Sequence, residues 1–370
     1  MEKKFDWKNL FFIIPFLILI SMSLLLMYHA GFISNLYQNN FEKQLLWFGI
    51  GFLILIFFKF FPIKLLFKYS LFLYIINVLL LILVLFIGKN INGAKAWIDL
   101  KYFTIQPSEF MKISYSLYLA YLCSKKKFFR WRDEIKFILY VLLLFAIPAI
   151  LVFLEPDTGA IIFYFFITLV LLWNSRIHKR WFVIFGIFVI SLIGGFFYLY
   201  FWQKDLLISL IGTTFFYRVD RLFSLGNGMQ IENALIALGS APLWRFSLTE
   251  TGIYIPEAPT DFIFALTSNV FGITGNIIIL LCFLILDFYF INYAKKIKKK
   301  EYRLFLYSFL VIFILSQLIN ISMNIGIFPI IGIPLPFLSY GGSSTIVLFI
   351  YLAIIFQTNA FKRKKRINSI

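Results

Sequence analysis

Residues 69–88 read YSLFLYIINVLLLILVLFIG, twenty positions without a charged side chain. A helix needs about 20 mostly apolar residues to cross the hydrocarbon core of a bilayer, so this run predicts a membrane-spanning helix. Nine further runs of the same kind occur along the chain. The ten expected spans lie near 10–28, 45–61, 69–88, 107–124, 135–153, 157–174, 181–202, 262–292, 304–328 and 338–360. The pattern predicts an all-α polytopic membrane protein with ten transmembrane helices.

The composition agrees with this prediction. Of the 370 residues, 61% are hydrophobic and only 14% are charged, whereas a soluble domain carries about 25% charged residues. A soluble domain, a disordered chain and a fibre are therefore excluded. Cys123 and Cys282 fall in apolar stretches and are interpreted as small buried hydrophobes. The net charge of +18 resides in the loops between spans, so we expect no nucleic-acid partner.

The first span has an alternative interpretation as a signal peptide. Lys3, Lys4 and Lys8 precede its apolar run, as they would in a secretory signal. The run is long, however, and no small-x-small cleavage site follows it. We therefore retain it as a span.

The positive charges predict the orientation. With both termini in the cytoplasm, 26 of the 35 Lys and Arg residues lie in the inner segments, as the positive-inside rule requires. The last ten residues, 361–370, then form a basic cytoplasmic tail. Its KRKKR run at 362–366 would face anionic lipid.

The loops predict where function lies. The inner loops are short, which leaves 1–370 as a single membrane domain without a cytosolic part, and no Walker A motif occurs. On the outside, a 59-residue loop at 203–261 joins spans 7 and 8, and a second loop at 89–106 joins spans 3 and 4. Loops on a rigid scaffold commonly carry function, so we expect the site on the outer face.

Charged residues at membrane depth are the first site candidates. Glu109 and Lys112 are three apart at the start of span 4 and share one helical face. The pair is either a mutually neutralising structural contact or the wall of a cavity that contacts a charged ligand. Because burying two charges is costly even when they are paired, we favour the cavity wall.

Further polar groups cluster at the ends of later spans. Glu155 and Asp157 lie in the tight turn before span 6, where Asp157 suits a helix cap and Glu155 has no such role. Gln317, Asn320 and Asn324 follow helical spacing in span 9 and are interpreted as interhelical hydrogen-bonding groups. Gly341 and Gly342, in a proline-rich segment before span 10, permit close approach of another helix or of a ligand.

The acid at the mouth of span 8 allows two interpretations. Pro259 keeps the preceding segment non-helical until Thr260 or Asp261. Asp261 would then sit at the N-terminus of the helix, where Asp is a favoured cap. From the residues alone the cap is the better interpretation, and catalysis is the alternative.

Four segments, in this order, resemble the SEDS family (shape, elongation, division and sporulation) of RodA, FtsW and SpoVE. They are NGAKAWI at 92–98 with QPSE at 106–109, EPDTG at 155–159, IPE at 255–257 with TDFIFA at 260–265, and GIPLPFLSYGGSS at 332–344. Within this family, the short terminal segments and the IPLPF sequence at 333–337 favour RodA. The resemblance covers nearly the whole chain.

The resemblance implies a peptidoglycan glycosyltransferase that polymerises lipid II on the outer face of the bacterial cytoplasmic membrane. A class B penicillin-binding protein would be its partner in a cell-wall elongation or division complex. The family's catalytic aspartate corresponds to Asp261, and its central cavity residues to Glu109 and Lys112. The remaining substrate-binding candidates are Lys95, Arg218, Arg221, Arg245, Glu257, Ser339, Gly341 and Gly342. No metal site is identified, although a divalent cation such as Mg²⁺ or Mn²⁺ could act near Glu257 or Glu155.

The chain departs from the family pattern near the expected site. Pro259 replaces the usual His, Ser268 and Asn269 replace a Glu-Glu pair, and Glu155 replaces a Gln. Two other classes stay open, the first through the Glu109–Lys112 pair with Asp261 only a cap, and the second through these departures. One is a flippase or transporter of lipid-linked precursors, and the other is a catalytically weak scaffold for a penicillin-binding protein.

Overall fold

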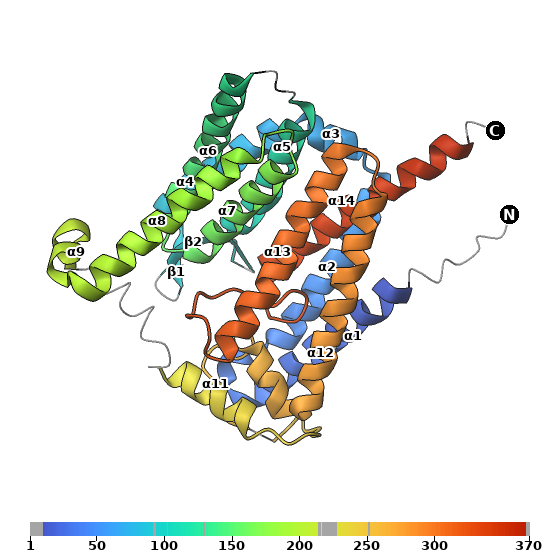
Figure 1. Ribbon diagram of the computed structural model, residues 1–370. Helices are drawn as coiled ribbons and strands as arrows, with labels where there is room; N and C mark the ends of the chain where they lie inside the picture. Colours follow the sequence, from blue (N-terminus) through green and yellow to red (C-terminus); the bar gives the residue numbers. More distant parts are fainter. Residues whose placement is uncertain are drawn as a thin grey trace.

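The computed structural model describes residues 10–91, 94–101, 103–126, 128, 130–213, 216, 228–250 and 252–367. Within this part of the chain, one long helix coincides with each expected span (Figure 1). These helices are α1 (Leu10–Ile33), α2 (Asn40–Phe60), α4 (Ser70–Ile87), α5 (Pro107–Lys125), α6 (Trp131–Leu154), α7 (Thr158–Trp173), α8 (Arg180–Trp202), α12 (Ile263–Lys296), α13 (Lys300–Asn324) and α14 (Gly342–Ile367). The last helix continues through the basic run that we expected to form a separate tail.

Seven helices among the described residues are long and apolar enough to cross a membrane: α1, α2, α4, α6, α8, α12 and α13. Helices α7 and α14 contain shorter apolar segments. Helix α5 is more polar, and it buries Ser108, Lys112, Ser114 and Ser116 inside the bundle. These helices show a multi-pass membrane protein.

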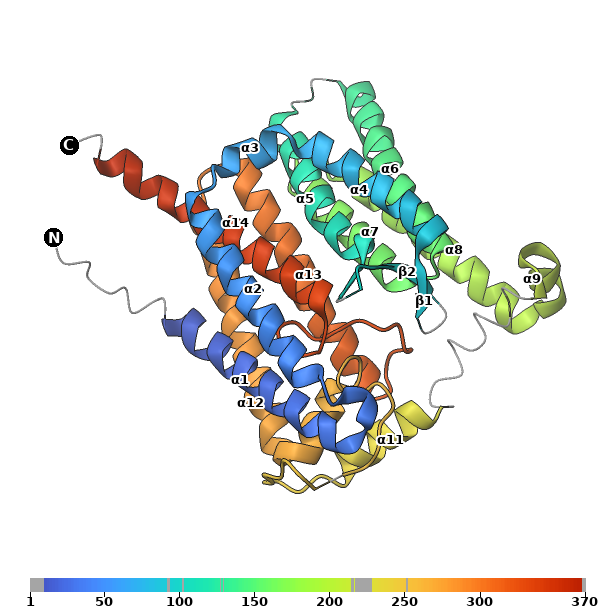
Figure 2. The same ribbon diagram turned by 180° about the vertical axis from the view of Figure 1, so that it is seen from behind.

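Helix α13 lies at the centre of the bundle, and α8 lies at its edge (Figures 1 and 2). Phe305, Phe309 and Phe313 recur every four residues along α13, and all three are fully buried. The rings of Phe309 and Phe313 stack with centroids 5.4 Å apart, and Phe305 stacks on Tyr351 of α14 at 5.0 Å. In contrast, the apolar window of α8 buries none of its residues.

Shorter elements occupy the loops. They are the 3₁₀ turn η2 (Asn35–Tyr37), α3 (Ile63–Lys68), β1 (Lys89–Ile91), β2 (Ala94–Asp99), β3 (Thr104–Ile105), α9 (Lys204–Ile211) and α11 (Met229–Gly239). The strands form an antiparallel sheet in the order β1-β2-β3. Because β3 ends just before α5 begins, the sheet fixes the position of the first turn of that helix.

Helix α12 is broken at Gly272, whose φ of 67° and ψ of −166° are not helical. The first two residues after the break donate backbone hydrogen bonds to two carbonyls of the long loop. Ile273 N–H donates to Pro242 O at 3.0 Å, and Thr274 N–H donates to Leu243 O at 3.1 Å. A Cβ at position 272 would lie 2.5 Å from Pro242 O, so only glycine fits. The first part of α12, up to Phe271, therefore packs as a separate unit beside the long loop.

Candidate active site

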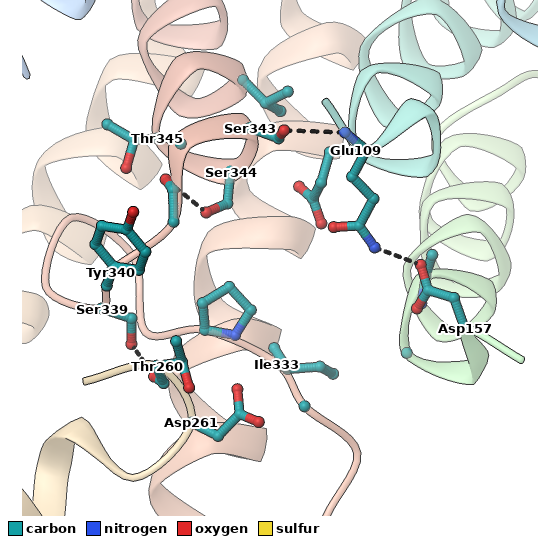
Figure 3. Close-up of a pocket in the computed structure, with 18 of the residues that line it drawn as sticks. Glu109, Asp157, Thr260, Asp261, Ile333, Ser339, Tyr340, Ser343, Ser344 and Thr345 are labelled. Carbon is teal, nitrogen blue, oxygen red and sulfur yellow. Dashed lines mark hydrogen bonds between the residues drawn. The ribbon is translucent and has the colours of Figure 1, made fainter. Parts of the chain in front are cut away.

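A cavity of about 990 Å³ opens where α5, α7 and α14 begin. The segments 257–261 and 330–341 form further walls, and residues of α2 and of the strands before α5 also line the cavity. Figure 3 shows the Asp261 carboxylate pointing into this space, with Glu109 and Asp157 on another wall. The cavity thus brings together segments that lie far apart in the sequence.

The backbone around Asp261 is fixed by two asparagines of α13. Asn320 Nδ2 donates to Asp261 O at 2.9 Å, and Asn324 Nδ2 donates to the same carbonyl at 3.0 Å. Asn320 Nδ2 also donates to Ile333 O at 2.8 Å, and Asn324 Oδ1 accepts from Ala265 N–H at 3.0 Å. The interpretation of these residues as hydrogen-bonding groups between helices is confirmed, and their partners include the site itself.

Asp261 does not cap α12, so the capping interpretation is wrong. The helix begins at Ile263 and its N-cap is Phe262, with no side-chain cap bond among the described residues. The Asp261 carboxylate lies instead against the loop before α14, where a Cβ on Gly332 would be 3.5 Å from Asp261 Oδ2. Gly332 has a φ of +72°, which favours glycine at this point of close approach.

Two carboxylates share this corner of the cavity. Burial raises the pKa of Asp261 to about 7, and the nearby Glu257 adds to this effect by like-charge repulsion. Glu257 Oε2 accepts from Thr260 Oγ1 at 3.0 Å, and the Glu257 carbonyl accepts from the N–H of Asp261 at 3.1 Å. Glu257 has a left-handed φ of +55°, a conformation that non-glycine residues adopt most often where function or packing requires it.

Ser339 joins the segment of Asp261 to the loop before α14. Its hydroxyl donates to Thr260 O at 2.6 Å, and Tyr340 N–H donates to Pro259 O at 2.8 Å. Ser339 is only 4% exposed. Its hydroxyl therefore holds the wall that carries Asp261.

Glu109 and Lys112 form the predicted pair, with Lys112 Nζ 2.5 Å from Glu109 Oε1. Their side chains are 12% and 5% exposed, and both residues line the cavity. The Lys112 ammonium also lies 4.2 Å from the centre of the Phe163 ring. The pair is thus buried but reaches the cavity surface.

The N-termini of α5 and α7 are linked through Asp157. Asp157 Oδ2 accepts from Gln106 Nε2 and from Ser108 Oγ, both at 2.8 Å. Its other oxygen accepts from Ala160 N–H at 3.4 Å, which confirms the predicted cap. Asp157 therefore fixes the wall that carries Glu109.

Glu155 lies in the turn between α6 and α7 and is fully buried. Neither of its carboxyl oxygens has a hydrogen-bond partner among the described residues. Burial, with a smaller effect from Asp157, raises the pKa of Glu155 to about 8. The carboxyl consequently holds its proton to higher pH than an exposed glutamate does, and Glu155 is absent from the cavity walls.

The other predicted site residues divide into three groups. Gly341 and Gly342 line the cavity. A Cβ at position 342 would lie 2.6 Å from the Trp47 ring and would collide with it. Lys95 donates to the Leu85 and Phe86 carbonyls at the end of α4, and Arg245 pairs with Glu250 at 3.1 Å. Neither of these two basic residues lines the cavity. Arg218 and Arg221 lie outside the described residues.

The cavity also contains residues that the sequence did not single out as site candidates. They include Lys43, Asp99, Gln106, Asp157, Thr260 and Gly332. The family motifs quoted above contain Gln106, Asp157, Thr260 and Gly332, so those motifs were the signal that could have identified these four residues. Lys43 is an isolated lysine in α2 and carries no such signal.

The departures Ser268 and Asn269 are buried in the first part of α12. Ser268 Oγ accepts from Asn276 Nδ2 at 2.6 Å, and Asn269 Nδ2 donates to Ile253 O at 2.9 Å. Asn269 therefore fastens the long loop to α12, whereas the Ser268 bond joins the two parts of α12 across the break at Gly272. Elsewhere, Cys123 and Cys282 are free and buried, as expected.

A helical membrane bundle with carboxylates and one buried lysine around a shared cavity defines a polytopic membrane protein with a polar site between its helices. The family model of cell cycle proteins that comprises FtsW, RodA and SpoVE matches residues 8–364. The chain belongs to this family.

Two curated relatives match nearly their whole length. A protein of Wigglesworthia glossinidia brevipalpis, named probable peptidoglycan glycosyltransferase FtsW, is 32% identical over 95% of this chain and 93% of its own. Stage V sporulation protein E of Bacillus subtilis (strain 168) is 30% identical over 98% of this chain and 100% of its own. These relatives are FtsW and SpoVE proteins, so the lean toward RodA stays a prediction.

Two solved structures share the fold. A chain from a peptidoglycan synthase complex that coordinates polymerisation and crosslinking has a TM-score of 0.77 and 22% identity, covering 97% of this chain and 99% of its own. The rod shape determining protein RodA of Thermus thermophilus has a TM-score of 0.66 and 22% identity, with 97% of each chain covered.

Proposed function

We propose that this protein is a peptidoglycan glycosyltransferase that polymerises lipid II on the outer face of the bacterial cytoplasmic membrane. The observation that carries the proposal is the Asp261 carboxylate on a cavity that also holds the Glu109–Lys112 pair. The FtsW name of the curated relatives supports it. In this proposal all ten long helices cross the membrane, both termini are cytoplasmic and the loop 203–261 is outside.

Asp261 acts as the general base. The 4-hydroxyl of the acceptor N-acetylglucosamine attacks C1 of the donor N-acetylmuramic acid, and its proton passes to the Asp261 carboxylate. A sugar hydroxyl is a weak nucleophile, so a positioned base contributes about 10²–10⁴ in rate. The pKa of about 7 suits this role, because a base is most effective when its pKa is near the working pH.

Positive charge stabilises the leaving group, undecaprenyl diphosphate. The bond from C1 to the diphosphate oxygen breaks as the new glycosidic bond forms, so negative charge develops on that oxygen. Lys112 lines the same cavity, and α5, α7 and α14 all begin there. The N-terminus of each helix carries a partial positive charge that favours a phosphate.

Glu257 would hold a divalent cation beside Asp261, which stays free to act as the base. Mg²⁺ commonly binds one or two carboxylates and completes its shell with substrate phosphates and water. The Glu257 carboxylate on the cavity wall fits this need. Such an ion would neutralise charge on the diphosphate. Among the described residues, no cluster of three or more His, Cys, Asp or Glu forms an all-protein metal site.

A class B penicillin-binding protein is the proposed partner. The similar solved chain comes from a complex that couples polymerisation with crosslinking. A glycan strand made at the cavity would pass to such a crosslinking partner. The complex would serve cell-wall elongation or division.

The proposal is tested with purified protein, labelled lipid II and a cognate class B penicillin-binding protein. Wild type is expected to form glycan chains. Asp261→Asn is expected to lose at least about 10²-fold in rate while keeping its melting temperature and partner binding. An isosteric amide changes neither the backbone bonds to Asn320 and Asn324 nor the side-chain volume, so folding should be unaffected.

Other outcomes would favour the alternative classes. Near-normal polymer from Asp261→Asn would remove Asp261 from the chemistry. No polymer from wild type with its partner, together with transfer of lipid II between leaflets of a vesicle, would support a flippase. No polymer and no transfer, with increased crosslinking by the partner, would support a scaffold.

A further inference from the structure

Three large apolar side chains stand out on the long loop after α11. Leu243, Trp244 and Phe246 are 69%, 72% and 61% exposed. They follow Pro242 within five residues, and we call residues 242–246 the anchor loop. Burial of apolar surface is worth about 25 cal/mol per Å², so three such side chains in water would be unfavourable unless another phase or partner covers them.

The length of α12 locates the membrane boundary. The whole helix has 34 residues, or about 51 Å at 1.5 Å per residue, whereas the hydrocarbon core is about 30 Å thick. The part from Ile273 to Lys296 measures about 36 Å by the same rise, and Lys295 and Lys296 mark its basic end. The break at Gly272 therefore lies at the opposite boundary of the bilayer.

Hydrogen bonds place the anchor loop at the same depth. The carbonyls of Pro242 and Leu243 accept from Ile273 and Thr274, the first two residues of the spanning part. On the other side of the break, Ser247 N–H donates to Val270 O at 3.1 Å. The loop is consequently bound to α12 at both ends of the break and cannot lie far from the boundary.

The spanning part of α12 that begins beside the anchor loop also exposes apolar side chains. Ile273, Ile277 and Ile278 are 40%, 46% and 39% exposed along the spanning part, where lipid is the surrounding phase. Tryptophan and other aromatic side chains concentrate at the membrane interface. Arg245, between the apolar residues, pairs with Glu250 and so keeps its charge on the polar side.

We propose that the anchor loop inserts Leu243, Trp244 and Phe246 into the interfacial region of the bilayer. The occupant of this surface is phospholipid, and the insertion holds the α12 break at a fixed depth. Phe246 also packs on Phe271 with ring centroids 5.8 Å apart, which couples the inserted face to the first part of α12. Asp261, just before that part, is thereby kept at a constant distance from the lipid surface. The inference does not depend on the proposed activity.

Nitroxide labels test this depth directly. Trp244→Cys and Leu243→Cys are each labelled in a background with Cys123 and Cys282 replaced, and reconstituted in phosphatidylethanolamine–phosphatidylglycerol vesicles. Power saturation with oxygen, which enters lipid, and with a water-soluble nickel chelate reports the environment. Thr249→Cys, at an exposed polar position of the same loop, is the aqueous control, and Leu281→Cys, 52% exposed on α12, is the lipid control.

Labels at both 243 and 244 are expected to favour oxygen over nickel, with ratios between those of positions 249 and 281. The use of two positions separates loop depth from any local effect of removing Trp244. Nickel access equal to that at position 249 would overturn the proposal. Nickel access without partner, followed by protection from both reagents when a class B penicillin-binding protein is added, would also overturn it and define a protein docking face.

Discussion

Glu257 and Asp261 lie four residues apart, and both carboxylates face one cavity. A charge on Glu257 opposes ionisation of Asp261, and burial acts in the same direction. Asp261 must be ionised to accept a proton. Its titration near neutral pH therefore makes the proposed activity sensitive to modest changes in either acidity or the neighbouring charge.

Glu257→Gln should move the acidic limb of the pH–rate profile. In wild type, kcat/KM should reach half its maximum near pH 7, where Asp261 titrates. Removing the Glu257 charge lowers the pKa of Asp261, so the limb should shift to lower pH. Asp99→Asn removes another carboxylate that lines the cavity and should leave the limb in place. An unshifted limb in Glu257→Gln would contradict the electrostatic coupling.

Lys112→Met should keep expression while reducing glycan polymerisation at least about tenfold, equivalent to about 1.4 kcal/mol of transition-state stabilisation. The change leaves Glu109 buried without its partner, which lowers stability as well. Glu109→Gln combined with Lys112→Met removes both charges and should restore the melting temperature without restoring polymer. Full recovery of polymer in the double variant would make the pair purely structural.

Glu155→Gln should be more stable than wild type at alkaline pH. The folded-state pKa of about 8 exceeds the ordinary value of 4.5, so the folded protein holds a proton that the unfolded chain releases. Stability from this group is present below pH 4.5 and is lost as pH rises to 8, at up to about 1.4 kcal/mol per pH unit.

The melting temperature of wild type in detergent should consequently fall relative to Glu155→Gln between pH 5 and pH 9. Glu250→Gln, which changes an exposed carboxylate, serves as the control. A difference between wild type and Glu155→Gln that is the same at both pH values would show that Glu155 titrates normally.

Among the elements, α12 shows how a helix longer than a membrane is accommodated. Its hydropathy made the span predictable, because an apolar run of that length has few alternatives in a bilayer. The break at Gly272 was not predictable in the same way. The carbonyls that satisfy it come from Pro242 and Leu243, some thirty residues earlier, and hydropathy carries no information on that pairing.

Gly272→Ala should destabilise the protein by about 1–3 kcal/mol, since the φ and ψ at this position are accessible almost only to glycine. The new Cβ would also press on the Pro242 carbonyl. Gly186→Ala, in α8 with open space around it, is the matched control and should be neutral. Thermal unfolding in detergent measures both. Equal melting temperatures for the two variants would mean that the break relaxes easily.

In the whole molecule, the helices were predictable and most of the cavity was not. The ten long helices follow from local hydropathy, and Asp261, Glu109 and Lys112 from motifs. The contact of Ser339 with Thr260 joins residues 79 apart, and the link from Gln106 to Asp157 joins residues 51 apart. Such pairings arise from helix packing. For the same reason Lys95 and Arg245, which looked available in the sequence, are bound elsewhere.

Thiol labelling should establish the orientation of the whole chain. Glu250→Cys, on the long loop, should react with a membrane-impermeant maleimide in intact spheroplasts. Lys298→Cys, between α12 and α13, should react only after lysis. Both native cysteines are buried, so background labelling should be low. The opposite pattern would place the cavity in the cytoplasm and remove the proposed substrate from its reach.

The residues that line the cavity run along the chain from Lys43, in α2, to Leu348, in α14. A nascent chain that has inserted every helix but the last still lacks Ser339, which holds Thr260, and the glycines beside it. The site therefore does not exist during synthesis until the final helix has left the ribosome and entered the bilayer. A chain that lacks α14 is therefore expected to be inactive in the proposed reaction.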